Sequence, residues 1–346
     1  MIIVLLLMSS LSFANCFELE STDSFSNKAS LSKLIDLEVK AAKIPGLSVV
    51  IGNSKSVVYK QHFGDAKVDS IFDLASLTKV FTATGFLKEL EKTDIAVSTN
   101  YKGLINYSDL LRHESGYKAG LASGDYRSTP HETFENISTL LPTRRRGKFH
   151  YSDINYLILA LELERLSRSS LNTYLEQQIF NELNMDSTSF NPANCKKCLE
   201  SVKGHKGVVH DPTSRFLGGV SGHAGLFSSI DDLSKFFSIF LNNGMFCNKE
   251  IISSDQLNAM TAKTKSMRGL GFDITSPYSR LPRGDHFKKN VSFGHTGFTG
   301  TSVWIDPSID IFVIVLSNSV LNIPSKKRFL KLNQKISNLV GGNFLQ

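Results

Sequence analysis

Strand-forming segments occur near both ends of this chain of 346 residues, and helix-forming segments lie between them. Near the start, Leu47–Ile51 and Val57–His62 are rich in β-formers, and Gly52–Lys55 between them is typical of a hairpin turn. Near the end, Thr301–Ile305 and Ile311–Ser317 form a second strand pair. Because a sheet must bury one face against other elements, we expect one antiparallel sheet that is built from both ends of the chain.

Amphipathic helices flank these strands. Leu31–Ala42 carries an apolar stripe and is followed by the helix-stopping pair Pro45-Gly46. A last helix carries apolar residues on one face, with Gly341-Gly342 as its predicted stop; its stripe consists of Phe329, Leu332, Ile336 and Leu339. The middle of the chain shows further helical patterns at Lys79–Glu91, Asn155–Arg165, Leu171–Leu183 and Asp232–Leu241.

This order predicts an α/β (α+β) fold, an antiparallel sheet flanked by terminal helices with an inserted all-helical domain. We assign residues 30–75 and 215–343 to the sheet-containing domain and residues 76–214 to the mainly helical one. The 41% hydrophobic content suits a globular chain of this length and excludes a disordered or polytopic membrane protein. The net charge of +7 is spread along the chain without a nucleic-acid-binding motif, so we expect no nucleic-acid partner.

The first residues predict export. Ile2–Phe13 is an apolar run that is too short to cross a bilayer, which takes about 20 residues. Ser12 and Ala14 match the small residues of a signal-peptidase site, so residues 1–14 are predicted to be a signal peptide. The mature protein would be periplasmic or extracellular, without an integral membrane span. A lipid anchor on Cys16 is a less favoured alternative because Asn15 precedes it, and an uncleaved anchor or buried helix stays open.

The four cysteines permit disulfides in an oxidising compartment, but the sequence leaves their pairing open; they are Cys16, Cys195, Cys198 and Cys247. Cys195 and Cys198, followed by His205 and His210, superficially resemble a zinc site. The six residues between Cys198 and His205 are fewer than the twelve or so that are usual in a zinc finger. We therefore expect a local disulfide or free thiols rather than a metal.

The pattern Ser-x-x-Lys occurs three times, as Ser30–Lys33, Ser76–Lys79 and Ser115–Lys118. Ser30 stands where the first helix is expected to begin and suits an N-cap. Gly116 would break any helix that carried both Ser115 and Lys118. Only Ser76 and Lys79 stand at the start of a predicted amphipathic helix, where a spacing of three residues places both side chains on one face.

Ser76 and Lys79 are therefore candidates for nucleophilic catalysis. A serine hydroxyl needs a neighbouring base, and a lysine is a base only when it is neutral. Burial near other cationic or hydrogen-bonding groups would lower the pKa of Lys79 toward that state. The alternative is structural, with Ser76 as a helix cap and Lys79 as a solvated side chain.

Two further segments add candidate groups. In Tyr151-Ser152-Asp153 the phenol could relay a proton, whereas Asp153 could equally serve as a helix N-cap. Gly294–Gly300 reads either as a glycine-rich turn or as a cleft edge. In the second interpretation His295 and Thr296 face the substrate, and the Phe298 N–H joins that of Ser76 in an oxyanion hole.

Other catalytic signatures are missing from the sequence, which has no G-x-S-x-G elbow, no H-E-x-x-H and no Walker loop. The glycine-rich stretch Gly218–Gly225 lacks the Lys-Ser/Thr ending that a phosphate loop requires. We therefore expect no nucleotide and no other cofactor.

In order and context, Ser76-Leu77-Thr78-Lys79, Tyr151-Ser152-Asp153 and His295-Thr296-Gly297 resemble the serine β-lactamase and penicillin-binding-protein superfamily, on its class C and esterase side. Flanking blocks agree over roughly residues 31 to 320. They are Phe72–Lys79, Leu110–Gly116, His210-Asp211 with Gly218–Phe227, and Phe293–Ser302. The motifs are most similar to those of bacterial penicillin-binding-like hydrolases and N-acetylmuramyl-L-alanine amidases.

This resemblance implies a two-domain fold with the active site between the sheet domain and the helical domain. It implies Ser76 as the acyl-accepting nucleophile, Lys79 as its base and Tyr151 as a partner in proton transfer. His295 stands where many relatives have lysine, and Asp153 where many have asparagine. A neutral histidine would hold a substrate carboxylate less well than lysine, which argues against efficient β-lactam turnover.

We therefore expect an exported, monomeric serine hydrolase that forms an acyl-enzyme at Ser76. Its substrate would be a small molecule or a cell-wall fragment, with amide or ester bonds in peptidoglycan-derived peptides cleaved in carboxypeptidase or amidase fashion. The alternatives are a broad carboxylesterase on the same fold and a penicillin-binding sensor that does not turn over.

Overall fold

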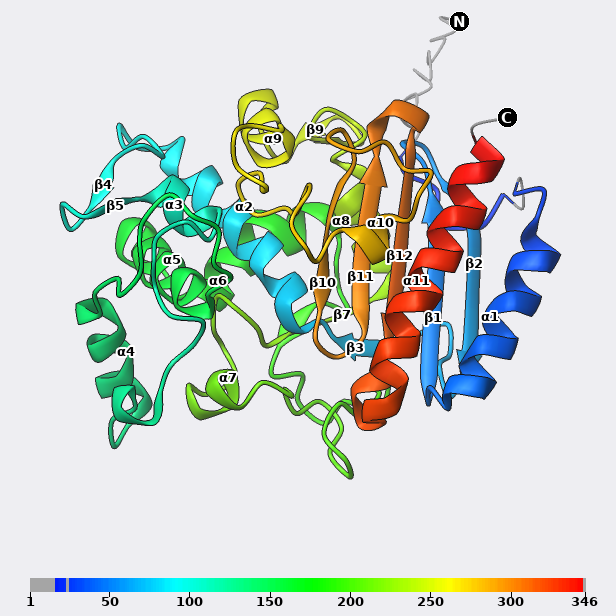
Figure 1. Ribbon diagram of the computed structural model, residues 1–346, viewed down its shortest axis with the longest axis horizontal. Helices are drawn as coiled ribbons and strands as arrows, with labels where there is room; N and C mark the ends of the chain where they lie inside the picture. Colours follow the sequence, from blue (N-terminus) through cyan, green and yellow to red (C-terminus); the bar gives the residue numbers. More distant parts are fainter. Residues whose placement is uncertain (1–15, 23–24, 345–346) are drawn as a thin grey trace, which may run out of the picture.

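The computed structural model describes residues 16–22 and 25–344, so the predicted signal peptide lies outside the described residues. Five antiparallel strands form the main sheet in the order β10-β11-β12-β1-β2 (Figure 1). Their bounds are β1 Gly46–Gly52, β2 Val57–Gly64, β10 Phe293–Gly297, β11 Thr301–Asp306 and β12 Ile311–Ser317. The two ends of the chain meet in the centre of the sheet, where Leu47 pairs with Ser317 and Ile51 with Val313.

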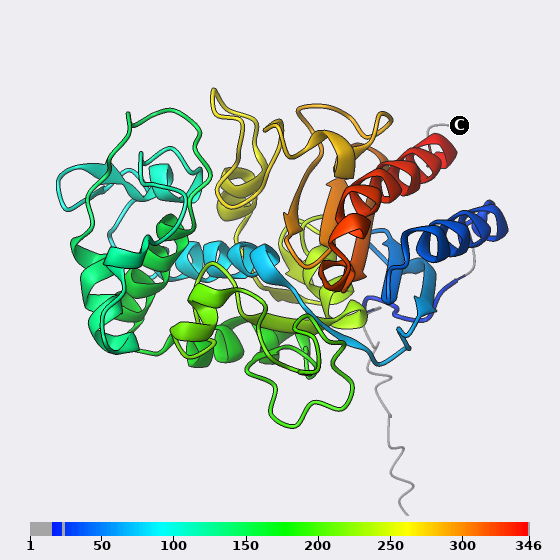
Figure 2. The ribbon, with the colours of Figure 1, turned by 60° about the horizontal axis from the view of Figure 1, so that its bottom comes forward.

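Each face of this sheet is covered by helices. Helices α1 (Lys28–Ala42) and α11 (Ile323–Phe344) lie side by side on one face (Figures 1 and 2). Helix α8 (Ile230–Ser238) packs against β1 and β12. Successive side chains of β12 point to opposite faces of the sheet. Val313 and Val315 pack in the core beneath α1 and α11, and Ile314 packs in the larger core on the other face.

The middle of the chain forms mainly helices, which lie beside the sheet. Helix α2, at the centre of Figure 1, is buried along nearly its whole length and packs against α5. The elements of this part are α2 Thr78–Leu90, β4 Asn100–Tyr101, β5 Ile105–Asn106, α3 Tyr107–Leu111, α4 Pro130–Thr139, α5 Asp153–Ser167 and α6 Leu171–Leu175. The predicted α/β architecture, with an antiparallel sheet, terminal helices and a helical part, is confirmed.

A second, smaller sheet links the two parts, in the order β3-β7-β6. Its strands are β3 Ile71–Asp73, β6 Ser189–Phe190 and β7 Leu226–Ser229. Strand β6 comes from within residues 76–214 but pairs with β7, so this range is not exclusively helical. The remaining elements are α7 Pro212–Phe216, β8 Met245–Phe246, β9 Lys249–Glu250, α9 Ser254–Thr261 and α10 Arg280–Arg283.

Two local expectations were wrong at helix ends. Helix α1 begins at Lys28 after Asn27, so Ser30 lies within its first turn and is not the N-cap. Helix α11 continues through Gly341-Gly342, because a glycine disfavours a helix by only about 1 kcal/mol and packing offsets that cost. There an added Cβ at Gly341 would come within 2.7 Å of the His286 side chain, so this glycine permits close packing.

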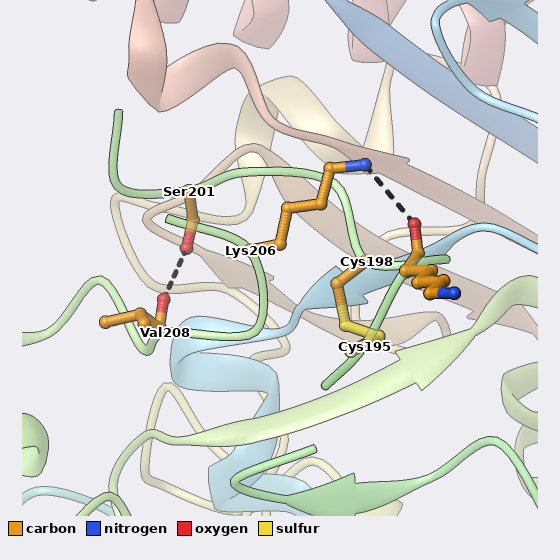
Figure 3. The surroundings of a disulfide bond; sticks show 6 residues. Cys195, Cys198, Ser201, Lys206 and Val208 are labelled. Carbon is orange, nitrogen blue, oxygen red and sulfur yellow. Dashed lines mark hydrogen bonds between the residues drawn. A yellow bond between two sulfur atoms is a disulfide. The ribbon is translucent and has the colours of Figure 1, made fainter. Parts of the chain in front are cut away.

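The cysteines form two disulfides, Cys16–Cys247 and Cys195–Cys198. The second closes a short loop beside Lys206, whose ammonium donates to the Lys196 carbonyl at 3.2 Å (Figure 3). The local disulfide expected from the sequence is therefore present, and its thiols are not available to a metal. Cys16 is bonded to Cys247, and a disulfide sulfur cannot also carry a lipid.

Within the described residues, no helix combines the length and apolar character that a membrane span requires.

Candidate active site

Ser76 lies on a single 3-10 turn, Ala75–Leu77, between strand β3 and helix α2. Ala75 has φ of 46°, a left-handed conformation that a residue with a Cβ rarely adopts and that costs about 1–3 kcal/mol. The buried Asp73 carboxylate holds the turn by accepting the Ala75 N–H at 2.9 Å. The sharp turn leaves Ser76 half-buried at the pocket while its neighbours Ala75 and Leu77 are buried.

The edge strand β10 packs directly against this turn. A Cβ on Gly297 would lie 2.4 Å from the Leu74 carbonyl oxygen, so only glycine allows this approach. Thr299 and Thr301 donate their hydroxyls to the carbonyls of Asp73 and Leu74, at 2.7 and 3.0 Å. Strand β10, from the far end of the chain, is thereby brought beside Ser76.

Lys79 lies on the first turn of α2 with its side chain completely buried. Its ammonium donates to Ser76 Oγ at 3.0 Å and to the His223 carbonyl at 2.9 Å. It also forms an ion pair with Asp153 Oδ1 at 2.8 Å. The alternative of a solvated Lys79 is therefore wrong, and the Ser76–Lys79 spacing brings both groups into contact.

The charge state of Lys79 differs from the sequence-based expectation. Burial acts to lower its pKa, as expected, but the Asp153 carboxylate and the Tyr151 hydroxyl outweigh burial and raise the pKa above its ordinary value. Lys79 is therefore an ammonium ion in the free protein, because a charge buried against a counter-charge is stabilised rather than neutralised.

Neither of the other two Ser-x-x-Lys pairs forms such a contact. Ser30 and Lys33 are both exposed on α1. Ser115 is buried and donates its hydroxyl to Asn155 Oδ1 at 2.5 Å, whereas Lys118 forms an ion pair with Asp125.

Tyr151 and Asp153 stand at the start of α5, where the N-cap position belongs to Ser152 rather than to Asp153. The Tyr151 ring lies 5.1 Å from the Lys79 ammonium. On its other side it stacks on the imidazole of His113, with ring centroids 4.3 Å apart. The structure thus brings Ser76, Lys79, Tyr151 and Asp153 together from two segments.

His113 is a residue that the sequence reasoning did not single out, although it lies within the block Leu110–Gly116. Its Nδ1 accepts the Ser152 N–H at 3.1 Å and is 3.2 Å from Asn155 Nδ2. Since Nδ1 is an acceptor, the ring is neutral with its hydrogen on Nε2. Burial, Arg268 and Lys79 together hold its pKa well below the ordinary value.

His295 faces this group from strand β10, where it pairs with Val303. Its Nδ1 lies 2.9 Å from the Thr296 carbonyl and must donate to it, which leaves Nε2 without a hydrogen. That Nε2 is buried and has no hydrogen-bond partner. Burial, aided by Arg268 and Lys79, holds the His295 pKa well below its ordinary value, so the imidazole is neutral.

A pocket of about 390 Å³ opens beside Ser76. Its lining includes the predicted residues Tyr151, His295, Thr296, Gly297 and Phe298. Phe298 is 53% exposed at its rim, and its ring stacks on His210. Apolar side chains form much of the remaining wall, namely Pro277, Tyr278, Leu281, Phe329 and Leu330.

Arg268 also lines the pocket and was not expected from any motif. Its guanidinium carbon lies 5.9 Å from the Tyr151 ring centroid.

The glycine-rich block Gly218–Phe227 packs behind Lys79. The His223 carbonyl accepts from the Lys79 ammonium, and the Gly222 carbonyl accepts the Thr82 hydroxyl at 2.8 Å. An added Cβ on Gly222 would lie 2.1 Å from the Tyr156 carbonyl, so the block packs tightly on α5. The His223 ring is anchored by Asp211, at 3.0 Å from Nε2.

A half-buried serine in contact with a buried lysine, at the mouth of a pocket, is the arrangement of a serine hydrolase with an amine partner. The family profile described as Beta-lactamase matches residues 31–332, and the chain belongs to this family. It is a β-lactamase-family hydrolase of the kind that includes penicillin-binding-protein-like enzymes. The resemblance identified from the motifs is confirmed.

Two curated relatives cover most of the chain. A protein of Escherichia coli O157:H7 named "Putative D-alanyl-D-alanine carboxypeptidase" is 27% identical over 342 residues, which cover 80% of this chain and 79% of that one. The N-acetylmuramyl-L-alanine amidase of Bacillus subtilis strain 168 is 27% identical over 365 residues, covering 86% and 82%.

Among solved structures, Simvastatin Synthase (LovD) from Aspergillus terreus superposes with a TM-score of 0.71. The match covers 93% of this chain and 99% of that chain at 13% identity, so it shows the shared fold alone.

Proposed function

We propose that this protein is an exported serine hydrolase that forms an acyl-enzyme at Ser76. Its substrates are amide or ester bonds in peptidoglycan-derived peptides, cleaved in carboxypeptidase or amidase fashion. The names of the two curated relatives support this substrate class. The observation that carries the chemistry is the chain of contacts from Ser76 through Lys79 to Asp153.

These contacts suggest how Ser76 loses its proton. In the free protein the Lys79 ammonium donates to Ser76 Oγ and cannot accept a proton. Lys79 becomes a base when it passes one proton to the Asp153 carboxylate, 2.8 Å away. The same amine then takes the Ser76 proton as Oγ attacks the carbonyl carbon, so the relay conserves charge within the site.

The strand side of the pocket receives the substrate. The backbone N–H groups of Ser76 and Phe298 form the oxyanion hole of this proposal, because β10 is held against the Ser76 turn. Tyr151 donates its hydroxyl proton to the leaving group and is reprotonated by the Lys79 ammonium, which recovers a proton from Asp153. His295 and Thr296 line the position of the acyl donor. Water then attacks the acyl-enzyme and releases Ser76.

Two disulfides support export, since such bonds persist in oxidising compartments. The signal peptide at residues 1–14 and the periplasmic or extracellular location stay part of this proposal.

A broad carboxylesterase is the second candidate, and the apolar wall around Tyr278 and Leu281 favours it because such a wall accepts an apolar acyl or alcohol group. A penicillin-binding sensor that acylates without turnover is the third.

Intact mass measurements on the purified protein separate these candidates. A fluorophosphonate and a penicillin are each added to the wild type and to Ser76→Ala. An adduct on the wild type alone supports Ser76 as the nucleophile. Penicillin labelling favours wall-peptide chemistry, fluorophosphonate labelling alone favours an esterase or amidase, and a penicillin adduct that never decays favours the sensor. Absence of any adduct contradicts the acyl-enzyme.

A further inference from the structure

The guanidinium of Arg268 is buried in the wall of the active-site pocket with most of its hydrogen-bonding capacity unused. The residue is 1% exposed. Its Nη2 donates to the Gly271 carbonyl at 3.3 Å, a long bond, and its Nε has no partner. Arginine carries five donor hydrogens in a planar fork, and a buried donor that stays unpaired costs about 1–3 kcal/mol.

The acidic neighbour of Arg268 pairs with it only loosely. Asp273 Oδ2 lies 3.6 Å from Nη1, longer than the roughly 2.7–2.9 Å of a tight charge-assisted bond. The same carboxylate is occupied by Ser276, which donates its hydroxyl at 2.6 Å and its N–H at 3.0 Å. The ion pair is loose, and the fork of the arginine is left open to another acceptor.

Lys79 and His295, the other basic groups near Ser76 among the described residues, are not available to a substrate carboxylate. Lys79 stands behind Ser76 and is held by Asp153. His295 is neutral, and its unprotonated Nε2 would repel a carboxylate rather than bind it. Among the described residues that line the pocket, Arg268 is the one basic side chain that is charged at neutral pH.

We propose that Arg268 is the residue with which this site binds a carboxylate of its substrate, and that the preferred substrates are short peptides with a free carboxylate near the scissile bond. The guanidinium supplies a bidentate partner from a segment outside the three catalytic motifs. This proposal rests on the proposed function for the identity of the bond that is cleaved, but not for the binding that it predicts.

The test measures binding without turnover. In the Ser76→Ala protein, calorimetry gives the Kd of an N-acylated D-Ala-D-Ala peptide with a free C-terminal carboxylate, and of the same peptide as its C-terminal amide. We expect the carboxylate form to bind at least about tenfold more tightly, which corresponds to about 1.4 kcal/mol. Equal affinities, or no binding of either peptide, would overturn the proposal.

Variants of Arg268 and Asp273 in the Ser76→Ala protein then separate a binding role from a structural one. Arg268→Gln should abolish the preference for the carboxylate peptide over the amide, and Arg268→Lys should retain part of it, because lysine keeps the charge but not the planar fork of donors. Asp273→Asn retains or enlarges the preference, since it removes the competing carboxylate. If Asp273→Asn instead abolished the preference as Arg268→Gln does, the arginine would have only a structural role and the proposal would fail.

Arg280→Gln is the matched control. Arg280 is exposed on α10 and does not line the pocket, although its neighbour Leu281 does. The preference should survive this change, and its loss there would point to general surface charge and count against Arg268. A wild-type protein that binds as expected but forms no adduct at Ser76 would refute the proposed hydrolase and leave the carboxylate site intact.

Discussion

The two sides of the active site differ in how completely their polar groups are paired. On the helical side, the Lys79 ammonium contacts Ser76, His223 and Asp153, all within 3.0 Å. On the strand side, His295 Nε2 and Arg268 Nε are buried without a hydrogen-bond partner, as is His113 Nε2 where the two sides meet. Buried polar groups are normally satisfied, so the contrast indicates different tasks. In the proposed mechanism the helical side is preorganised for proton transfer, and the strand side keeps donors and acceptors for a ligand.

The largest expected effect comes from removing the nucleophile on the helical side. Ser76→Ala should lower the turnover of any substrate by about 10³-fold or more, because it removes the hydroxyl that accepts the acyl group in the proposed mechanism. Steady-state kinetics with an aryl ester measures this, with melting temperature as a control for folding. Residual turnover near the wild-type rate would refute the acyl-enzyme.

Asp153→Asn tests whether the helical side depends on its ion pair. Burial would then dominate, and the pKa of Lys79 should fall below its ordinary value. The rate of acylation should gain a limb that rises with pH between about 7 and 10, by up to about tenfold for each unit. Wild-type Lys79, with its raised pKa, stays protonated in this range and should show no such limb.

The same variant changes stability with a defined sign. In the wild type the raised pKa of Lys79 adds no slope below about pH 10.5, since the amine is charged in both the folded and the unfolded state. In Asp153→Asn the lowered pKa makes the unfolded state bind the extra proton, so stability should fall as pH drops below about 10.5. Denaturant unfolding at pH 7 and pH 10 checks this, and an unchanged difference between the two would contradict it.

His113 lies where the two sides meet and is expected to act by positioning Tyr151. His113→Phe keeps the stacked ring but leaves the Ser152 N–H and Asn155 Nδ2 without their acceptor. We expect kcat to fall about tenfold, equal to roughly 1.4 kcal/mol, with KM little changed.

His113→Asn is the matched variant, since it offers an acceptor but no ring to stack. A larger loss in His113→Asn than in His113→Phe would mean that stacking, not the hydrogen bond, holds Tyr151 in place. A KM effect without a kcat effect would contradict the positioning role.

The smallest effect concerns the neutral histidine of the strand side. Burial holds the pKa of His295 well below 6.5. Below about pH 6.5 the histidine is therefore protonated in the unfolded state but still neutral in the folded state. Stability should therefore decline as pH falls from about 6.5, by about 1 kcal/mol per unit. His295→Gln should flatten part of this slope in denaturant unfolding between pH 7 and 5, and an unchanged slope would argue against a buried neutral ring.

The local sequence was enough for the elements and for the contact between Ser76 and Lys79. The hairpins at the two ends, the terminal helices and the Ser76–Lys79 spacing follow from patterns within a few residues, and the structure contains all of them. The family followed from three short motifs in order. These features are local because turn chemistry and apolar periodicity act over one or two turns of chain.

What the tertiary structure decided is the electrostatic state of the site. The pKa of Lys79 depends on a carboxylate that lies 74 positions along the chain, and burial alone pointed in the opposite direction. The end of α11 also differs from the local prediction, because tertiary packing lets the helix continue through Gly341-Gly342. Arg268 and His113 became visible only when folding placed them around Tyr151, because the interaction between charges depends on their distance and burial in space rather than on their separation in sequence.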